Sequence, residues 1–164
     1  MLTAEEVARY FLSKDVNREL FTKKLITKNG RTFYSGNARL NKYLHLSQNV
    51  YIGMTGNKLF SDDLYAYDNG AIVPSVSSQF PILFSSKSVP DISDKEIKTF
   101  LDKMYSILGD AELEELIEIS HEDDAWQAKS NQYYLTDEKM DTLAFKDIYK
   151  KQYKDVIEMI GEMD

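Results

Sequence analysis

The side chains in this sequence that could carry out chemistry are few and poorly grouped for catalysis. The chain has two histidines, His45 and His121, and no cysteine, which excludes disulfides, thiolate metal sites and a cysteine nucleophile. It contains no glycine-rich phosphate loop, no G-x-S-x-G and no H-E-x-x-H. His45 lies at the edge of an apolar helical stripe, which favours a hydrogen-bonded structural role. We therefore expect no catalytic residues.

A metal site is conceivable only at the run His121-Glu122-Asp123-Asp124, which offers imidazole and carboxylate ligands. Adjacent residues of a helix point in different directions, so this run cannot enclose an ion by itself. The favoured interpretation is a polar cluster at a helix end. We expect neither a metal nor an organic cofactor.

Carboxylates dominate residues 110–127, a segment without Lys or Arg. Several are spaced four apart, so on one helix they would form an acidic ridge in which each like-charge pair costs about 0.2–0.5 kcal/mol. The favoured interpretation is a solvated face, or a face beside the protein's own basic first third. The alternative is a surface for a basic partner, whose candidate residues are Glu114, Glu118, Glu122, Asp123 and Asp124.

A basic cluster and a single tryptophan complete the candidate partner-binding residues. Lys23, Lys24, Lys28 and Arg31 surround the dipeptide Asn29-Gly30. Lysines on an edge strand prevent unwanted strand pairing, and contact with phosphates or an acidic partner is the alternative. Trp126 is interpreted as a core residue, with an interface anchor as the alternative.

Length and composition predict one folded domain spanning residues 1–164. Apolar residues make up 43% of the chain, with eight Phe and eleven Tyr, which is enough for a packed core. The net charge of −7 makes nucleic acid an improbable partner, although residues 1–60 alone carry ten Lys/Arg against four Asp/Glu. No leader-like start is present, and no apolar run approaches the ~18–20 residues of a membrane helix. We expect a cytoplasmic protein with no membrane contact.

Hydrophobic periodicity predicts a mainly α fold (α+β), a compact helical domain with a small β-hairpin or short sheet. Thr3 and Glu6 form a capping box before a first helix. Asn29-Gly30 predicts a two-residue turn between strands 24–28 and 31–34. A second helix is expected over about 38–54 with Gly56 as its stop, then a strand at 64–67 and a short helix opened by Pro74 and limited by Pro81.

Three further helices are expected in the second half. A capping box at Ser93 and Glu96 precedes a stripe that ends near Gly109, and another helix begins at Asp110. A single C-terminal helix should present one apolar face from Phe145 to Ile160. The residues expected to be largely buried in these stripes are Phe100, Leu101, Met104, Tyr149, Val156 and Ile157.

Four short blocks in order resemble the Panacea (SocA-like) antitoxin domain family, which is also widespread in phages and mobile elements. The family pattern is L-Q-K-L-L-Y, T-G-x-x-L-F, W-x-Y-G-P-V-V-P and T-H-x-x-x-P-W. The corresponding blocks here are LNKYLH at 40–45, TGNKLF at 55–60, YDNGAIVP at 67–74 and SHEDDAW at 120–126. Asn69, Ala71 and Ala125 depart from the pattern. The hairpin at about 22–35 looks like an insertion between the first two helices of the family.

The resemblance implies a protein-binding module that neutralises a cognate toxin by direct contact, in some members as an adaptor to a protease. The toxin it implies is a small protein encoded nearby. It implies no enzymatic activity. One alternative is a phage or mobile-element accessory protein that binds another host or defence protein. A less favoured alternative is a nucleic-acid-binding regulator that uses the basic hairpin.

Overall fold

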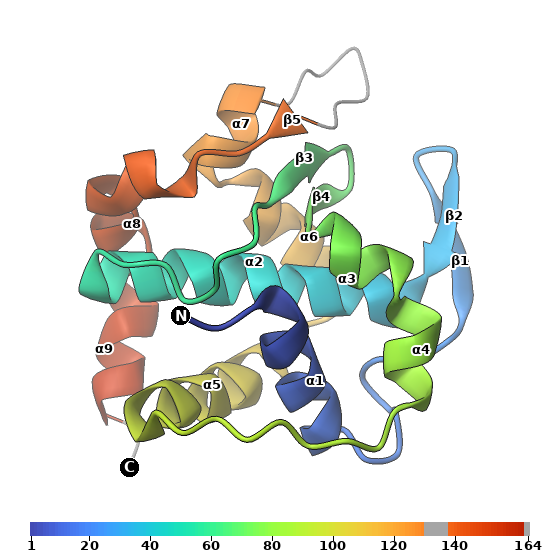
Figure 1. Cartoon of the computed structure of the whole chain (residues 1–164). Coiled ribbons are helices and arrows are strands. Elements are labelled where there is room, and N and C mark those ends of the chain that lie inside the picture. The colour runs from blue at the N-terminus through green and yellow to red at the C-terminus, as the bar shows by residue number, and fades with distance from the viewer. Residues whose placement is uncertain (130–137, 163–164) are drawn as a thin grey trace.

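The computed structural model describes residues 1–129 and 138–162 and is mainly helical, as the sequence predicts. Figure 1 shows α2 (Ser35–Thr55) crossing the middle of the molecule, with α1 (Ala4–Lys14) and α5 (Lys95–Leu108) below it and a small sheet above it. The hairpin of β1 (Leu25–Lys28) and β2 (Arg31–Tyr34) lies at one end of α2.

The remaining elements cover the other sides of α2. The small sheet has the order β4-β3-β5, and all its pairings are antiparallel. Its strands are β3 (Tyr65–Tyr67), β4 (Gly70–Ile72) and β5 (Glu138–Lys139). The other helices are α3 (Pro74–Ser78), α4 (Phe80–Ser85), α6 (Leu113–His121), α7 (Asp124–Lys129), the 3-10 helix η1 (Thr142–Phe145), α8 (Lys146–Gln152) and α9 (Lys154–Glu162). Within the described ranges, no helix is both long and apolar enough to cross a membrane.

Local sequence signals account for several element ends. The capping box of α1 is confirmed, because Thr3 Oγ1 accepts from Glu6 N at 3.2 Å and Glu6 Oε1 accepts from Thr3 N at 3.0 Å. The box predicted at Ser93 is wrong. Asp94 is the N-cap of α5, and its carboxylate accepts from the amides of Glu96 and Ile97. An ionised carboxylate is a stronger acceptor for these amides than a hydroxyl.

The predicted β-hairpin is confirmed, with Lys28 paired to Arg31 across the turn. Asn29 and Gly30 have φ angles of 52° and 76°, the positive values that a two-residue turn of this kind requires. The strand predicted near 64–67 is also present as β3. Its partners β4 and β5 were not predicted, because three-residue and two-residue strands are too short for an alternating pattern to emerge.

The central helix α2 is enclosed on all sides, although the sequence predicts a single buried face. It begins at Ser35, three residues before the predicted start, and every residue from 40 to 50 is buried. Polar side chains on its flanks are buried because they hold the backbones of surrounding loops. Gln48 accepts from the amide of Leu59 at 2.7 Å, and Asn41 accepts from the amide of Val73 at 2.8 Å. Gly56 ends the helix with φ 77°, as predicted.

The C-terminal segment is not one helix. It is divided at Tyr153 into α8 and α9, where Tyr153 and Tyr149 both contribute to a buried polar cluster described below. Phe100, Leu101, Met104 and Tyr149 are buried, as predicted. Val156 and Ile157 are only half-buried, which corrects the prediction for these two residues. They lie on the terminal helix α9, which packs through one side against α2 and α5.

Candidate functional site

The tip of the β1–β2 hairpin contacts α6 and the β3–β4 turn. Lys28 forms an ion pair with Glu114, in the first turn of α6. Asn29 donates from Nδ2 to Asn69 Oδ1 at 2.7 Å, and Asn69 Nδ2 donates to the Lys28 carbonyl at 3.3 Å. These contacts join three separate elements into one surface, which we call the hairpin–α6 surface (Lys28, Asn29, Arg31, Asp68, Asn69, Glu114).

A second ion pair lies beside the first. Arg31 Nε is 3.1 Å from Asp68 Oδ1, and its guanidinium carbon lies 5.8 Å from the centre of the Tyr67 ring. The Nε–H is not aligned for a hydrogen bond, and neither oxygen of Asp68 accepts one within the described residues. The attraction is therefore that of opposite charges rather than of a directed hydrogen bond.

The predicted polar cluster at the end of α6 is built from His121 and Trp126. Their rings stack at 4.2 Å with an interplanar angle of 20°. Trp126 Nε1 donates to the Tyr67 carbonyl at 2.8 Å, and His121 Nε2 donates to the Asp68 carbonyl at 2.9 Å. Burial lowers the pKa of His121, so the ring is held neutral near pH 7. Both side chains fasten α6 and α7 to the β3–β4 turn, and Trp126 is half-buried.

The acidic residues do not form one ridge. The predicted helix start at Asp110 is wrong, since α6 begins at Leu113 after a capping box formed by Glu112 and Glu115. A break at Glu122 and Asp123 separates α6 from α7. Glu114, Glu118 and Glu122 are exposed, and Asp124 is half-buried in the first turn of α7.

Asp123 lies inside the protein, which corrects its assignment to a partner-facing ridge. Its Oδ2 is 2.5 Å from His45 Nε2 and 2.9 Å from Asn49 Nδ2. Its Oδ1 accepts from Tyr149 Oη at 2.7 Å, and Tyr153 Oη accepts from Asn49 at 3.1 Å. Burial alone would raise the pKa of Asp123, but the hydrogen bonds from His45, Tyr149 and Asn49 outweigh it and hold the pKa below its usual range.

The pair His45 and Asp123 resembles the orienting half of a general base, but its position excludes that use. Both side chains have 0% exposure, so no substrate reaches the imidazole without local unfolding. The cluster instead joins α2, the α6–α7 break and α8, because His45 and Asn49 come from α2, Asp123 from the break and Tyr149 from α8. This confirms His45 as a hydrogen-bonded structural residue.

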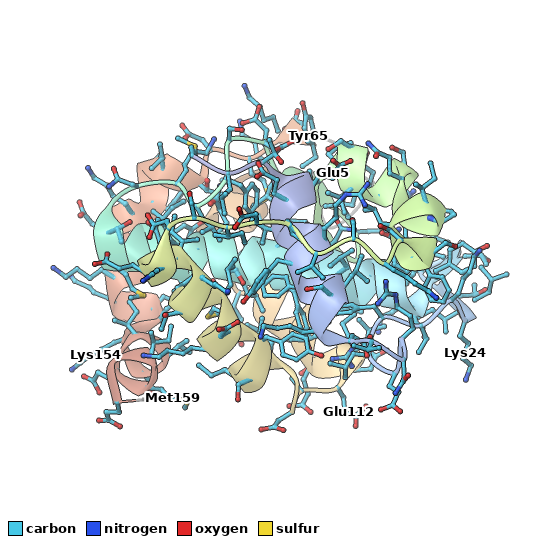
Figure 2. The ribbon with its side chains drawn as sticks, turned by 60° about the horizontal axis from the view of Figure 1, so that its bottom comes forward. Glu5, Lys24, Tyr65, Glu112, Lys154 and Met159 are labelled. Atoms are coloured by element: carbon cyan, nitrogen blue, oxygen red, sulfur yellow. The ribbon has the colours of Figure 1, made fainter. Side chains whose placement is uncertain are left out.

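The basic residues are divided between two places. Lys28 and Arg31 lie on the hairpin–α6 surface. Lys23 lies near the other end of the hairpin, 5.9 Å from the Tyr34 ring and 5.6 Å from the Phe84 ring. Lys24 is exposed, and Figure 2 shows its side chain extending away from the ribbon into solvent.

One buried cation escaped the sequence interpretation. Lys42, in the middle of α2, has an exposure of 1%, and burial lowers its pKa to about 8. It reaches a pocket of about 180 Å³ whose lining also includes Arg31, Asn41, Asp68 and Gly70. The sequence prediction named only the apolar face of this helix and gave Lys42 no role. Among the described residues, no group of three His, Asp or Glu is placed to hold a metal ion.

A comparison with protein families gives the context for this site. The model described as "Antitoxin SocA-like, Panacea domain" matches residues 40–127. The match includes most of α2 with Lys42, the β3–β4 turn, α6 and Trp126, and it begins after the β1–β2 hairpin. No curated protein and no solved structure matches the chain. Because the family model covers more than half of the sequence, the chain belongs to the family of antitoxin SocA-like proteins with a Panacea domain.

Proposed function

We propose that this protein is an antitoxin-like module that neutralises a cognate toxin by direct protein contact. The observation that carries the proposal is the family match over residues 40–127. The proposed mode of action is binding without catalysis. The His45–Asp123 pair supports this, because it is sealed inside the fold and holds helices together.

The hairpin–α6 surface and the exposed acids of α6 are the proposed contact region. Glu118 and Glu122 are exposed, whereas Glu114 is 65% exposed and paired with Lys28. Charged groups at the rim of an interface chiefly set the association rate and the choice of partner. We propose that the exposed acids of α6 attract a toxin with a basic surface, and that apolar contacts beside them supply most of the affinity.

A growth-rescue experiment tests the function. The open reading frame beside this gene is expressed from an inducible promoter, alone and together with this protein. Growth arrest by the neighbour alone and recovery on co-expression are the expected results. A neighbour that does not inhibit growth, or an arrest that this protein does not relieve, would contradict the proposal and would favour an accessory protein with another host or defence target.

A charge-reversal variant locates the contact region in the same assay. Glu114→Lys with Glu118→Lys should weaken the rescue. The matched control is Glu158→Lys with Glu162→Lys, which makes the same change at the same spacing on the exposed side of α9. Equal rescue by both double variants would move the contact region away from α6.

The route of neutralisation is separable by measuring the toxin itself. Direct inhibition leaves the amount of toxin unchanged while its activity falls, whereas handing the toxin to a protease shortens its lifetime. A nucleic-acid-binding role has less support, because Lys28 and Arg31 are already paired with carboxylates. Salt-sensitive DNA binding that is lost on reversing Lys24 would revive that alternative.

A further inference from the structure

The pocket between the hairpin and α2 is lined in part by the buried ammonium group of Lys42. It has a volume of about 180 Å³ and is lined by polar groups from α2, β2 and the β3–β4 turn, together with the apolar side chains of Phe33 and Ile72. Lys42 is 1% exposed and makes no hydrogen bond or ion pair with the described residues. Asp68 attracts the ammonium group, but burial without a hydrogen-bond partner outweighs this attraction and destabilises the charged form.

Gly70 makes room for Lys42. A Cβ at position 70 would lie 2.5 Å from Lys42 Cε and 2.6 Å from Ser120 Oγ, closer than such contacts occur. Gly70 also has φ 113°, a conformation that other residues rarely adopt. The absence of a side chain at Gly70 therefore leaves the space in which the Lys42 side chain extends to the pocket.

The neutral polar groups around the pocket are already engaged. Asn41 donates to the Asn37 carbonyl and to Asn37 Oδ1, each at 3.0 Å, and accepts from the Val73 amide. Asn37 donates to Ser77 Oγ at 3.0 Å. Arg31 Nε is a buried donor without an aligned partner. Lys42 also makes no hydrogen bond with the described residues.

The charges that face the pocket sum to one positive charge. Lys42 and Arg31 contribute two cations, and Asp68 contributes one carboxylate whose oxygens accept no hydrogen bond from the part of the chain that the structure describes. His121 adds no charge to this set, because burial lowers its pKa, and the charges of Lys42 and Lys28 lower it further. A monovalent anion would balance this set, whereas a dianion would be repelled by Asp68.

We infer that this pocket binds a carboxylate group, which Lys42 and Arg31 hold from two sides. A carboxylate has the single charge and the two acceptor oxygens that these donors call for. The apolar walls suit a short aliphatic chain attached to it. The source is either a free small acid or an acidic side chain of a bound protein.

The test uses the full chain and no toxin, so its outcome is independent of the growth-rescue experiment. Backbone amide NMR spectra are recorded while sodium propionate replaces sodium chloride at constant ionic strength. Saturable shifts at Thr32, Asn69 and Gly70 are expected. Lys42→Met should weaken the affinity at least about tenfold, while Lys24→Met, which removes a charge from the exposed part of the same hairpin, should leave it unchanged.

A pH series provides a second readout that does not depend on any variant folding. Because the pKa of Lys42 is about 8, propionate affinity of the wild-type protein should fall as the pH rises past that value. Capped glutamate (N-acetyl-glutamate amide) distinguishes the two sources. Tighter binding than propionate points to a side chain of a partner, and equal or weaker binding points to a free small acid.

Three results would overturn the inference. One is the absence of saturable shifts with either carboxylate. The second is unchanged affinity in a folded Lys42→Met variant or across the pH series. The third is inorganic phosphate binding more tightly than propionate at a pH where it is a dianion, since that would show that Asp68 does not limit the site to one charge.

Discussion

Lys28, at the end of β1, forms an ion pair with Glu114, in the first turn of α6. This contact brings the basic first third of the chain against its acidic remainder. The sequence left two interpretations of the acidic segment open, a face beside the protein's own cations or a face for a partner. The structure realises the first at Glu114, while Glu118 and Glu122 remain exposed and available for the second.

Reversing the charges of Glu114 and Glu118 one at a time separates these roles. Glu114→Lys removes the ion pair and should lower the free energy of unfolding by about 0.2–1 kcal/mol, since an exposed pair contributes little. Glu118→Lys should leave stability unchanged. Both variants, and more so the double variant, should slow association with the native partner and weaken its salt dependence.

Denaturant unfolding and stopped-flow association are the measurements. Lys28→Glu combined with Glu114→Lys restores opposite charges and should recover the lost stability. If Glu114→Lys with Glu118→Lys lowers the free energy of unfolding but leaves the association rate at the wild-type value, the acids of α6 serve only the fold.

Removing the carboxylate of Asp123 should be among the most damaging single changes. Asp123→Ala leaves His45, Asn49 and Tyr149 buried without their common partner and should cost about 3–5 kcal/mol. Asp124→Ala, one position along and half-buried, is the matched control and should cost far less. Equal losses from the two changes would show that the cluster is not a main source of stability.

The lowered pKa of Asp123 also predicts that the protein loses stability at low pH. Its pKa is lowered in the fold, so its contribution to stability is fully present above its unfolded pKa of about 4 and is lost as the pH falls through the lower, folded value. The loss of stability on acidification should therefore be shallower in Asp123→Asn than in the wild type. Parallel pH curves from urea unfolding would contradict this.

Lys42 predicts a rise in stability with pH as well, but in the alkaline range. Its folded pKa of about 8 lies below the unfolded value of 10.5, so the unfolded state binds more protons between these two values. Stability should rise with pH across this window, by about 3 kcal/mol in total, since one pKa unit corresponds to about 1.4 kcal/mol. Lys42→Met should be more stable than the wild type below pH 8 and should lose its advantage as the pH rises.

Lys87→Met, an exposed change of the same kind, is the control and should follow the wild-type curve. A Lys42→Met variant less stable than the wild type at pH 7 would show that the ammonium group has a partner that balances its burial.

The stripe of α5 makes a prediction about packing. Phe100 is 4% exposed and meets the Tyr51 ring at 5.2 Å with an interplanar angle of 72°. Phe100→Ala should cost about 3–5 kcal/mol, because it leaves a cavity between α5 and α2. Ile82→Ala, at a position 65% exposed, should cost little. A thermal melt of Phe100→Ala within two degrees of the wild type would contradict the burial.

Local signals in the sequence determined those features that depend on neighbouring residues. Thr3 and Glu6 form their capping box without help from the rest of the chain, and Asn29-Gly30 sets its own turn. Gly56 and Pro74 mark a helix end and a helix start for the same reason. The stripe of α5 is equally local, since its period alone reveals which face is apolar.

Only the tertiary structure decided the roles of the polar residues. His45 and Asp123 are 78 positions apart and meet because α2 is enclosed on every side, which no 3.6-residue pattern on α2 reveals. Asp123 looks like one more acid in an acidic run, yet it is withdrawn from solvent by the break between α6 and α7. Lys42 is charged, and no local pattern predicts its burial, but Gly70, 28 positions further along the chain, leaves the space that buries it. Sequence patterns report the average surroundings of a residue type, whereas burial of a charge depends on distant groups that folding brings together.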